Sequence, residues 1–132
     1  IAEDARGFPM DSGCPFCDVE QTLFENELAF AIYDRHPVSP GHILVIPKRH
    51  LPDIFEATPD ELQALADIMR RVKEFADADY APDGYNIGIN SGRTAGQTIM
   101  HLHIHFIPRY SGDRRDPTGG IRGVIPRKRK YP

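Results

Sequence analysis

The sequence lacks any long hydrophobic run and contains few cysteines. No apolar stretch approaches the roughly 20 residues that a membrane-spanning helix needs. The first ten residues have neither the basic start nor the apolar stretch of a secretory signal peptide. The two cysteines, Cys14 and Cys17, are too few for the disulfide framework of a small secreted domain. These absences predict a cytoplasmic protein that does not insert into membranes.

The sequence also has no internal repeat and no low-complexity segment. Its 132 residues, 40% of them hydrophobic and 27% charged, are typical of one globular domain. The net charge of −3 is unevenly distributed, because residues 109–132 contain eight Lys and Arg against two Asp. We therefore expect a flexible N-terminal segment at residues 1–11, a folded domain at 12–110 and a basic C-terminal tail at 111–132. Basic tails can contact phosphates, but for the last six residues a solvated tail is the simpler interpretation, and no specific nucleic-acid partner is expected.

Turn residues and hydrophobic patterns divide the chain into short strands and one helix. The predicted strands cover residues 28–34, 42–47, 85–90 and 100–108. The first two are joined by a connection that contains proline and glycine and suits a hairpin. Hairpin strands with one long helix predict an α+β fold, in which the helix packs on one face of an antiparallel sheet.

The helix is predicted to begin at Thr58, followed by Pro59, Asp60 and Glu61. Thr58 can cap the helix, Pro59 suits its first turn, and Glu61 completes a capping box. Apolar residues then follow at helical spacing: Leu62, Leu65, Ala66, Met69, Val72 and Ala76. We expect this stripe to pack on the sheet.

Residues 101–105 read His-Leu-His-Ile-His. Successive side chains of a strand point to opposite faces, so His101, His103 and His105 are predicted to form one row, opposite a core-facing Leu102 and Ile104. Imidazole carries protons near neutral pH and can attack phosphorus as a nucleophile. The chain has only six histidines, so the strict alternation of three of them in this segment indicates a functional surface.

The turn before this row carries groups that suit an anion. Backbone N–H groups at Gly96, Gln97 and Thr98, together with the Gln97 amide and the Thr98 hydroxyl, are predicted to hold phosphate oxygens. A glycine-containing turn is by itself only a turn, and its position next to three histidines is what favours an anion site.

The motif Cys14-Pro15-Phe16-Cys17 has the spacing for two thiolate ligands of one zinc ion, which needs two further ligands. His50 and His101 are the candidates. A redox-active dithiol and a pair of unliganded buried thiols are the alternatives, although the strand-then-helix context of a redox dithiol is missing.

Beyond these short motifs, longer stretches of the sequence resemble the histidine triad (HIT) family. The resemblance runs from Cys14 to Tyr110 and is carried by residues 41–50, 86–90 and 95–98, the last leading into the histidine row. It implies a HIT-like fold, a homodimer and a nucleotide pocket in each subunit. The implied chemistry is hydrolysis or transfer at the α-phosphate of nucleoside phosphate derivatives, either dinucleoside polyphosphates or nucleoside phosphoramidates. The Pro-Arg sequence at 108–109 looks closer to the dinucleoside-polyphosphate-hydrolysing branch or to bacterial-type members.

The resemblance also implies roles for individual residues. His103 matches the nucleophile, which forms a covalent nucleotidyl intermediate. His105 matches the residue that contacts phosphate and helps to protonate the leaving group, and His42 matches a fourth histidine packed against the triad. Asp34 matches the position that hydrogen-bonds the ribose hydroxyls.

The remaining implied contacts form three groups. The base pocket consists of Phe16, Val19 and Ile32, the phosphate and leaving-group contacts are Asn90, Gln97 and Thr98, and a structural zinc is held by Cys14, Cys17, His50 and His101.

Two other function classes stay open. A zinc hydrolase could use His101, His103 and His105 as ligands of a metal that activates water, although no carboxylate base lies near them in the sequence. A non-catalytic nucleotide-binding module, signalling through a partner, would need the same binding residues as the enzyme.

Overall fold

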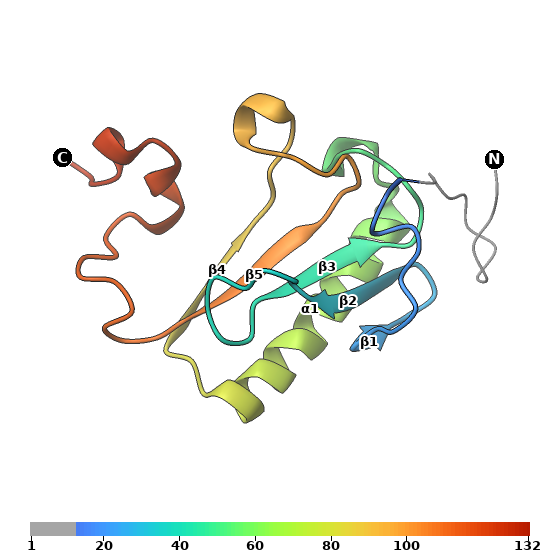
Figure 1. The fold of residues 1–132 in the computed structure, drawn as a ribbon, viewed down its shortest axis with the longest axis horizontal. Coiled ribbons are helices and arrows are strands. Elements are labelled where there is room, and N and C mark those ends of the chain that lie inside the picture. Colours follow the sequence, from blue (N-terminus) through green and yellow to red (C-terminus); the bar gives the residue numbers. More distant parts are fainter. Residues whose placement is uncertain (1–12) are drawn as a thin grey trace.

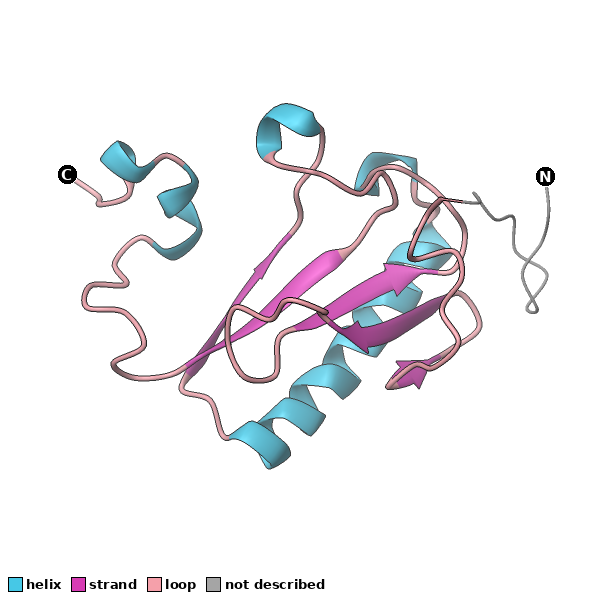
Figure 2. Ribbon diagram, viewed as in Figure 1, coloured by secondary structure: helices cyan, strands magenta, loops and turns pink. Residues whose placement is uncertain are grey.

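The computed structural model describes residues 13–132, and the segment predicted to be flexible, residues 1–11, lies outside this range. The described chain forms a five-stranded antiparallel sheet with a long helix across one face (Figure 1). Figure 2 shows this helix behind the strands, with the loop between β2 and β3 in front of them. The predicted α+β fold is confirmed.

The elements have the following bounds. The strands are β1 (Phe24–Glu25), β2 (Ala29–Tyr33), β3 (Ile43–Pro47), β4 (Gly84–Gly88) and β5 (Ile104–Arg109), and their order across the sheet is β1-β2-β3-β5-β4. The long helix is α1 (Pro59–Tyr80), and the short 3₁₀ helices are η1 (Ile54–Glu56), η2 (Arg93–Ala95), η3 (Gly120–Val124) and η4 (Pro126–Lys128). Within residues 13–132, no helix combines the length and the apolar content that crossing a membrane requires.

The hairpin of β2 and β3 forms as predicted and brings two polar side chains together. The Asp34 N–H donates to the His42 carbonyl at 3.0 Å, which closes the pair of strands at its loop end. Gly41 ends the loop with φ +86°, and a Cβ there would lie 3.1 Å from the Tyr80 ring and 3.2 Å from Pro108. A side chain at position 41 would therefore be strained and crowded. The hairpin places Asp34 and His42 side by side.

Helix α1 begins with the predicted capping box. The Thr58 hydroxyl accepts from the Glu61 N–H at 3.1 Å, and the Glu61 carboxylate accepts from the Thr58 N–H at 3.0 Å. The predicted apolar stripe is partly wrong, because Leu62 is 41% exposed. The buried face is instead Ala64, Leu65, Ile68, Val72 and Ala76. The apolar surface of α1 is thus wider than the area that the sheet covers.

The histidine row begins before its strand rather than within it. Strand β5 starts at Ile104, four residues later than predicted, because the last β3 residue paired with it is Val45, opposite Ile104. The preceding backbone bonds instead to the loop after β3, where the Leu102 N–H donates to the Leu51 carbonyl at 2.7 Å. Leu102, Ile104 and Phe106 nevertheless pack in the core, so the alternation holds.

The C-terminal segment is largely exposed to solvent and also makes hydrogen bonds within itself. The Arg129 guanidinium donates to the Thr118 carbonyl at 2.8 Å, and the Arg122 guanidinium donates to the Lys128 carbonyl at 2.8 Å. Helix η3 lies against β4. Figure 1 shows the segment beyond the β4 side of the sheet. Its domain boundary stays a prediction.

Candidate active site and metal cluster

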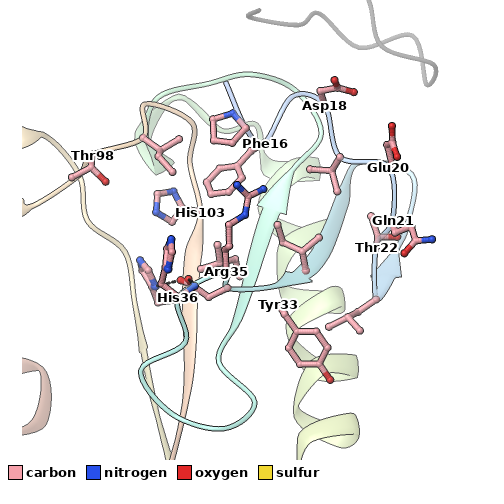
Figure 3. A pocket seen from close by; sticks show the side chains of 18 of the residues that line it. Phe16, Asp18, Glu20, Gln21, Thr22, Tyr33, Arg35, His36, Thr98 and His103 are labelled. Carbon is pink, nitrogen blue, oxygen red and sulfur yellow. Dashed lines mark hydrogen bonds and ion pairs between the residues drawn. The ribbon is translucent and has the colours of Figure 1, made fainter. Parts of the chain in front are cut away.

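A cavity of about 930 Å³ opens over the ends of β2 and β5, a volume within the usual range for a ligand pocket. Figure 3 shows His103 and Phe16 near one end of this cavity and Tyr33, Gln21 and Thr22 toward the other. The residues predicted for the site that line it are Phe16, Val19, Ile32, Asp34, Asn90, Gly96, Thr98, His103 and His105. Arg35 and His36, which directly follow Asp34 at the end of β2, also line the cavity and were not predicted from the sequence.

One part of the cavity is apolar. Phe16 and Leu44 are buried together with Phe30 and Ile46, and Val19 and Ile32 pack against this cluster. The flat ring and the branched aliphatic side chains offer a surface on which a nucleobase could stack or pack.

His103 has a defined tautomer. Its Nδ1 lies 2.8 Å from the backbone carbonyl oxygen of His101. Because a carbonyl oxygen only accepts, Nδ1 carries a proton, and in the neutral ring the lone pair therefore lies on Nε2. The ring is 9% exposed and lines the cavity, so this nitrogen belongs to a nearly buried imidazole at the cavity wall. Such an arrangement presents a nucleophile without a proton that must first be removed.

His42 and His105 form a second, linked pair. The Val38 N–H donates to Nδ1 of His42 at 3.1 Å, so His42 carries its proton on Nε2. That Nε2 lies 3.0 Å from Nδ1 of His105. His105 therefore accepts on Nδ1 and carries its own proton on Nε2. His42 is buried and does not line the cavity, so it contacts the cavity wall only indirectly, through His105.

Burial favours the neutral form of both imidazoles. It lowers the pKa of His42 below that of a free imidazole, while the Asp34 carboxylate partly offsets this effect. Burial also lowers the pKa of His105, and the neighbouring rings of His103 and His42 lower it further. The neutral pair preserves the tautomers derived from the hydrogen bonds.

The Asp34 carboxylate lies close to the rings of His42 and His105. Its Oδ2 lies 3.4 Å from Nε2 of His42 and 4.0 Å from Nδ1 of His105. Its Oδ1 accepts from the His36 N–H at 2.8 Å. The side chain is 18% exposed and lines the cavity, so its remaining lone pairs can accept from a ligand. The ribose contact predicted for Asp34 stays a prediction.

The turn before the histidines differs in one respect from the predicted anion site. The N–H groups of Gly96 and Gln97 donate to the carbonyls of Arg93 and Gly92 at 2.9 and 3.1 Å, so both are used inside the turn. The phosphate contact predicted for these two N–H groups stays a prediction. The Gln97 side chain is 4% exposed, accepts from the Gly92 N–H and donates to the Pro52 carbonyl. Gln97 shapes the turn, and its proposed contact with the leaving group stays a prediction.

The CxxC motif meets the two predicted histidines. The ligand atoms of Cys14, Cys17, His50 and His101 all lie within 4.8 Å of one another. Nδ1 of His101 lies 3.3 Å from Sγ of Cys14, 3.6 Å from Sγ of Cys17 and 3.2 Å from Nδ1 of His50. Ligands of a tetrahedral zinc ion are about 3.3–3.8 Å apart, given zinc–sulfur bonds of about 2.3 Å and zinc–nitrogen bonds of about 2.0–2.1 Å.

The protonation of the cluster also fits a zinc ion. Nε2 of His101 lies 2.8 Å from the Pro47 carbonyl oxygen and must donate to it, which leaves Nδ1 of His101 as a ligand. Burial raises the pKa of the Cys14 thiol to about 11, so a neutral thiol is favoured without a cation and a thiolate with one. These donors fit a closed structural zinc site.

The three alternating histidines do not converge as ligands of one metal. Among the described residues, the sets of three or more ligands that gather are the Cys/His cluster and the set Asp34, His42 and His105. His101 belongs to the first set, and His105 to the second. This geometry disfavours the zinc hydrolase in which all three bind one catalytic metal.

Comparisons with known proteins agree with this architecture. A family model described as the HIT domain matches residues 18–112. A zinc-bound histidine triad family protein from Mycobacterium smegmatis has a similar solved structure, with a TM-score of 0.70 and 37% sequence identity, over 80% of this chain and 84% of that one.

Two curated relatives are named as enzymes. The chain is 39% identical over 93 residues to the asymmetrical bis(5'-nucleosyl)-tetraphosphatase of Schizosaccharomyces pombe. This match covers 70% of this chain and 51% of that protein. It is also 39% identical over 93 residues to the bis(5'-adenosyl)-triphosphatase of Dictyostelium discoideum, covering 70% and 62% respectively. The chain thus spans about half to three fifths of the length of these relatives.

Proposed function

This chain belongs to the HIT family, and from that premise we propose that it is a nucleotide hydrolase or transferase acting at the α-phosphate of nucleoside phosphate derivatives. The observation that carries the proposal is the pair of opposite tautomers at the cavity wall. His103 offers a lone pair on Nε2, while His105 offers a proton on Nε2. One ring is arranged to attack phosphorus, and the other to stabilise the oxygens around it.

The first step forms a covalent intermediate. Nε2 of His103 attacks the α-phosphorus, a nitrogen–phosphorus bond forms, and the bond from phosphorus to the leaving group breaks with its electron pair on the leaving group. The His103 ring gains positive charge, which the His101 carbonyl stabilises through the hydrogen bond from Nδ1. A polyphosphate leaves as a stable anion and needs only a hydrogen bond from His105.

The second step returns the enzyme to its starting state. Water attacks phosphorus, the nitrogen–phosphorus bond breaks, and its electron pair returns to Nε2 of His103. The water proton passes to bulk solvent, and the nucleoside monophosphate is released. Another acceptor in place of water would make the same chemistry a transfer.

The substrate class follows from the two parts of the cavity. The apolar part around Phe16 and Ile32 suits a nucleobase, and Asp34 suits the hydroxyls of a ribose between that part and the histidines. The two relatives named as dinucleoside polyphosphate hydrolases support a second nucleotide as the leaving group. We therefore favour dinucleoside polyphosphates over phosphoramidates.

A ranked panel tests the function. Diadenosine tetraphosphate, diadenosine triphosphate and a fluorogenic adenosine phosphoramidate should be compared by kcat/KM for the wild type and for His103→Ala purified identically. We expect turnover by the wild type and a loss of about 10⁴-fold or more in the variant, because its nucleophile is gone. No turnover of any substrate by the wild type would favour the binding module instead.

We also propose one structural zinc ion per chain, held by Cys14, Cys17, His50 and His101. The spacing of the four donors and the tautomer of His101 support it. When bound, the ion would tie the loop at residues 14–17 to the segment before β5. It takes no part in the steps above.

A homodimer is the third part of the proposal. An apolar groove of about 280 Å³ runs between α1 and β4, which is an edge strand of the sheet. Leu62 and Ile87 border this groove and are 41% and 39% exposed. A second copy could cover this surface about a two-fold axis, because the same helix and edge strand would meet from both sides.

A further inference from the structure

Phe16 lies inside the four-residue loop that carries both cysteines, yet its side chain is 6% exposed. The loop is held in a turn by the Cys17 N–H, which donates to the Cys14 carbonyl at 3.2 Å. The position of the Phe16 ring therefore depends on a turn whose two ends are predicted metal ligands.

The same ring touches a member of each site. Its centroid lies 5.9 Å from the ring of His101, at an interplanar angle of 86°, and 5.1 Å from the ring of His103, at 63°. Both contacts have the edge-to-face geometry that aromatic rings favour. His101 is a predicted ligand in the Cys/His cluster, and His103 is the proposed nucleophile. Figure 3 shows the Phe16 ring close to His103.

A backbone contact joins the same two sites. The proton on Nδ1 of His103 is held by the carbonyl oxygen of His101, and the His101 side chain is fixed between the cluster and the Pro47 carbonyl. The ring contact and the backbone contact thus hold His103 from two directions. Phe16 also lines the ligand cavity, as His103 does.

We propose that Phe16 is a positioning residue that couples the Cys/His cluster to the nucleotide pocket. With the cluster closed around a metal, the Phe16 ring fixes the plane of the His103 ring and completes the apolar wall beside Leu44. With the cluster open, both the wall and the nucleophile lose this support. The inference rests on the proposed function, because it takes the cavity to be a nucleotide site.

Thermodynamic linkage makes this coupling measurable without turnover. If the metal strengthens nucleotide binding by some factor, the nucleotide must strengthen metal binding by the same factor. The apparent zinc affinity should be measured by competition with a chelating dye, with and without saturating AMP. The proteins to compare are the wild type, Phe16→Leu and Val19→Ala. Val19 lies in the same apolar wall, and its contacts there are with the cluster of Phe16, Phe30, Leu44 and Ile46.

In the wild type, AMP should raise zinc affinity by about 5-fold or more, the lower end of typical coupling between sites. Val19→Ala should keep most of this factor, although it weakens AMP binding. Phe16→Leu retains apolar bulk and should reduce the factor to nearly one. Circular dichroism of the zinc-free proteins would separate this effect from coupling through unfolding, because unfolding would couple the sites in all three proteins.

Kinetics give an independent readout. Phe16→Leu should lower kcat, because His103 is misplaced, whereas Val19→Ala should chiefly raise KM. An AMP effect on zinc affinity that is equal in the wild type and Phe16→Leu would overturn the inference and leave the proposed function intact. Failure of the wild type to bind AMP would overturn both.

Discussion

The Nδ1–H of His103 donates to the carbonyl oxygen of His101 at 2.8 Å, so the backbone of one histidine holds the ring of another histidine two residues later. The side chain of His101 points into the Cys/His cluster, while its backbone fixes the tautomer of His103. In the neutral ring, a carbonyl acceptor at this distance leaves the lone pair of His103 on Nε2. The same carbonyl would stabilise the positive charge formed in the proposed attack on phosphorus. The alternation that first marks these residues thus accompanies a separation in space, with His101 in the cluster and His103 at the cavity wall.

The first prediction concerns the metal. Elemental analysis should find one zinc per chain, and Cys14→Ser and His50→Ala should lose it. Each should lower the melting temperature by about 10 °C or more, since 1 kcal/mol shifts Tm by about 3–4 °C in a domain of this size and a structural zinc contributes several kcal/mol. His36→Ala is the matched control, because this exposed histidine lies outside the cluster. A metal-free wild type that is equally stable in chelator would contradict the assignment.

The second prediction concerns the pKa values of His42 and His105, measured by NMR titration of their imidazole protons. Both should titrate below a free imidazole, because burial lowers them. The Asp34 carboxylate raises both values, so Asp34→Asn should lower both further. Values that rise in Asp34→Asn would mean that the carboxylate does not face this pair.

The lowered pKa values of His42 and His105 also determine how the free energy of unfolding changes with pH. The unfolded chain protonates these histidines at a higher pH than the native state does. Acidification below about 6.5 should therefore favour unfolding, until the native imidazoles protonate as well. Urea unfolding at stepwise lower pH would show the free energy of unfolding falling over this range.

The third prediction concerns the groove between α1 and β4. Leu62→Glu should convert the protein from a dimer to a monomer at micromolar concentration, as measured by sedimentation or light scattering, because it places a charge in an apolar contact. Val38→Glu is the control, since Val38 is 72% exposed on the hairpin loop and does not line the groove. A wild type that is monomeric, or a Leu62→Glu variant that stays dimeric, would exclude this surface as the interface.

Much of the site could be predicted from local pattern. The alternation at residues 101–105 correctly placed Leu102 and Ile104 in the core, and the CxxC spacing correctly indicated a cluster with two histidines. The capping box at Thr58 and Glu61 also formed as predicted. In each case, the determining contacts lie within one segment or follow from strand geometry.

The misses depend on partners that are distant in sequence. The start of β5 is set by where pairing with Val45 ends, which no pattern in residues 100–108 reveals. The inward orientation of the Gln97 amide likewise depends on the Pro52 carbonyl and the Gly92 N–H, while its contact with the leaving group stays a prediction. The exposure of Leu62 depends on how far the sheet extends under α1, and a helical period alone does not contain that information.

The central claim is that His103 becomes covalently attached to the nucleotide. The most direct measurement is rapid quenching of the wild type with an adenosine phosphoramidate or diadenosine polyphosphate, followed by intact-mass and peptide mass spectrometry. We expect an adenylyl group on the peptide that contains His103, stable in base and labile in acid, and no such adduct in His103→Ala. A wild-type protein that turns over substrate while its quenched His103 peptide never carries the nucleotide, combined with full activity of His103→Ala, would contradict the claim.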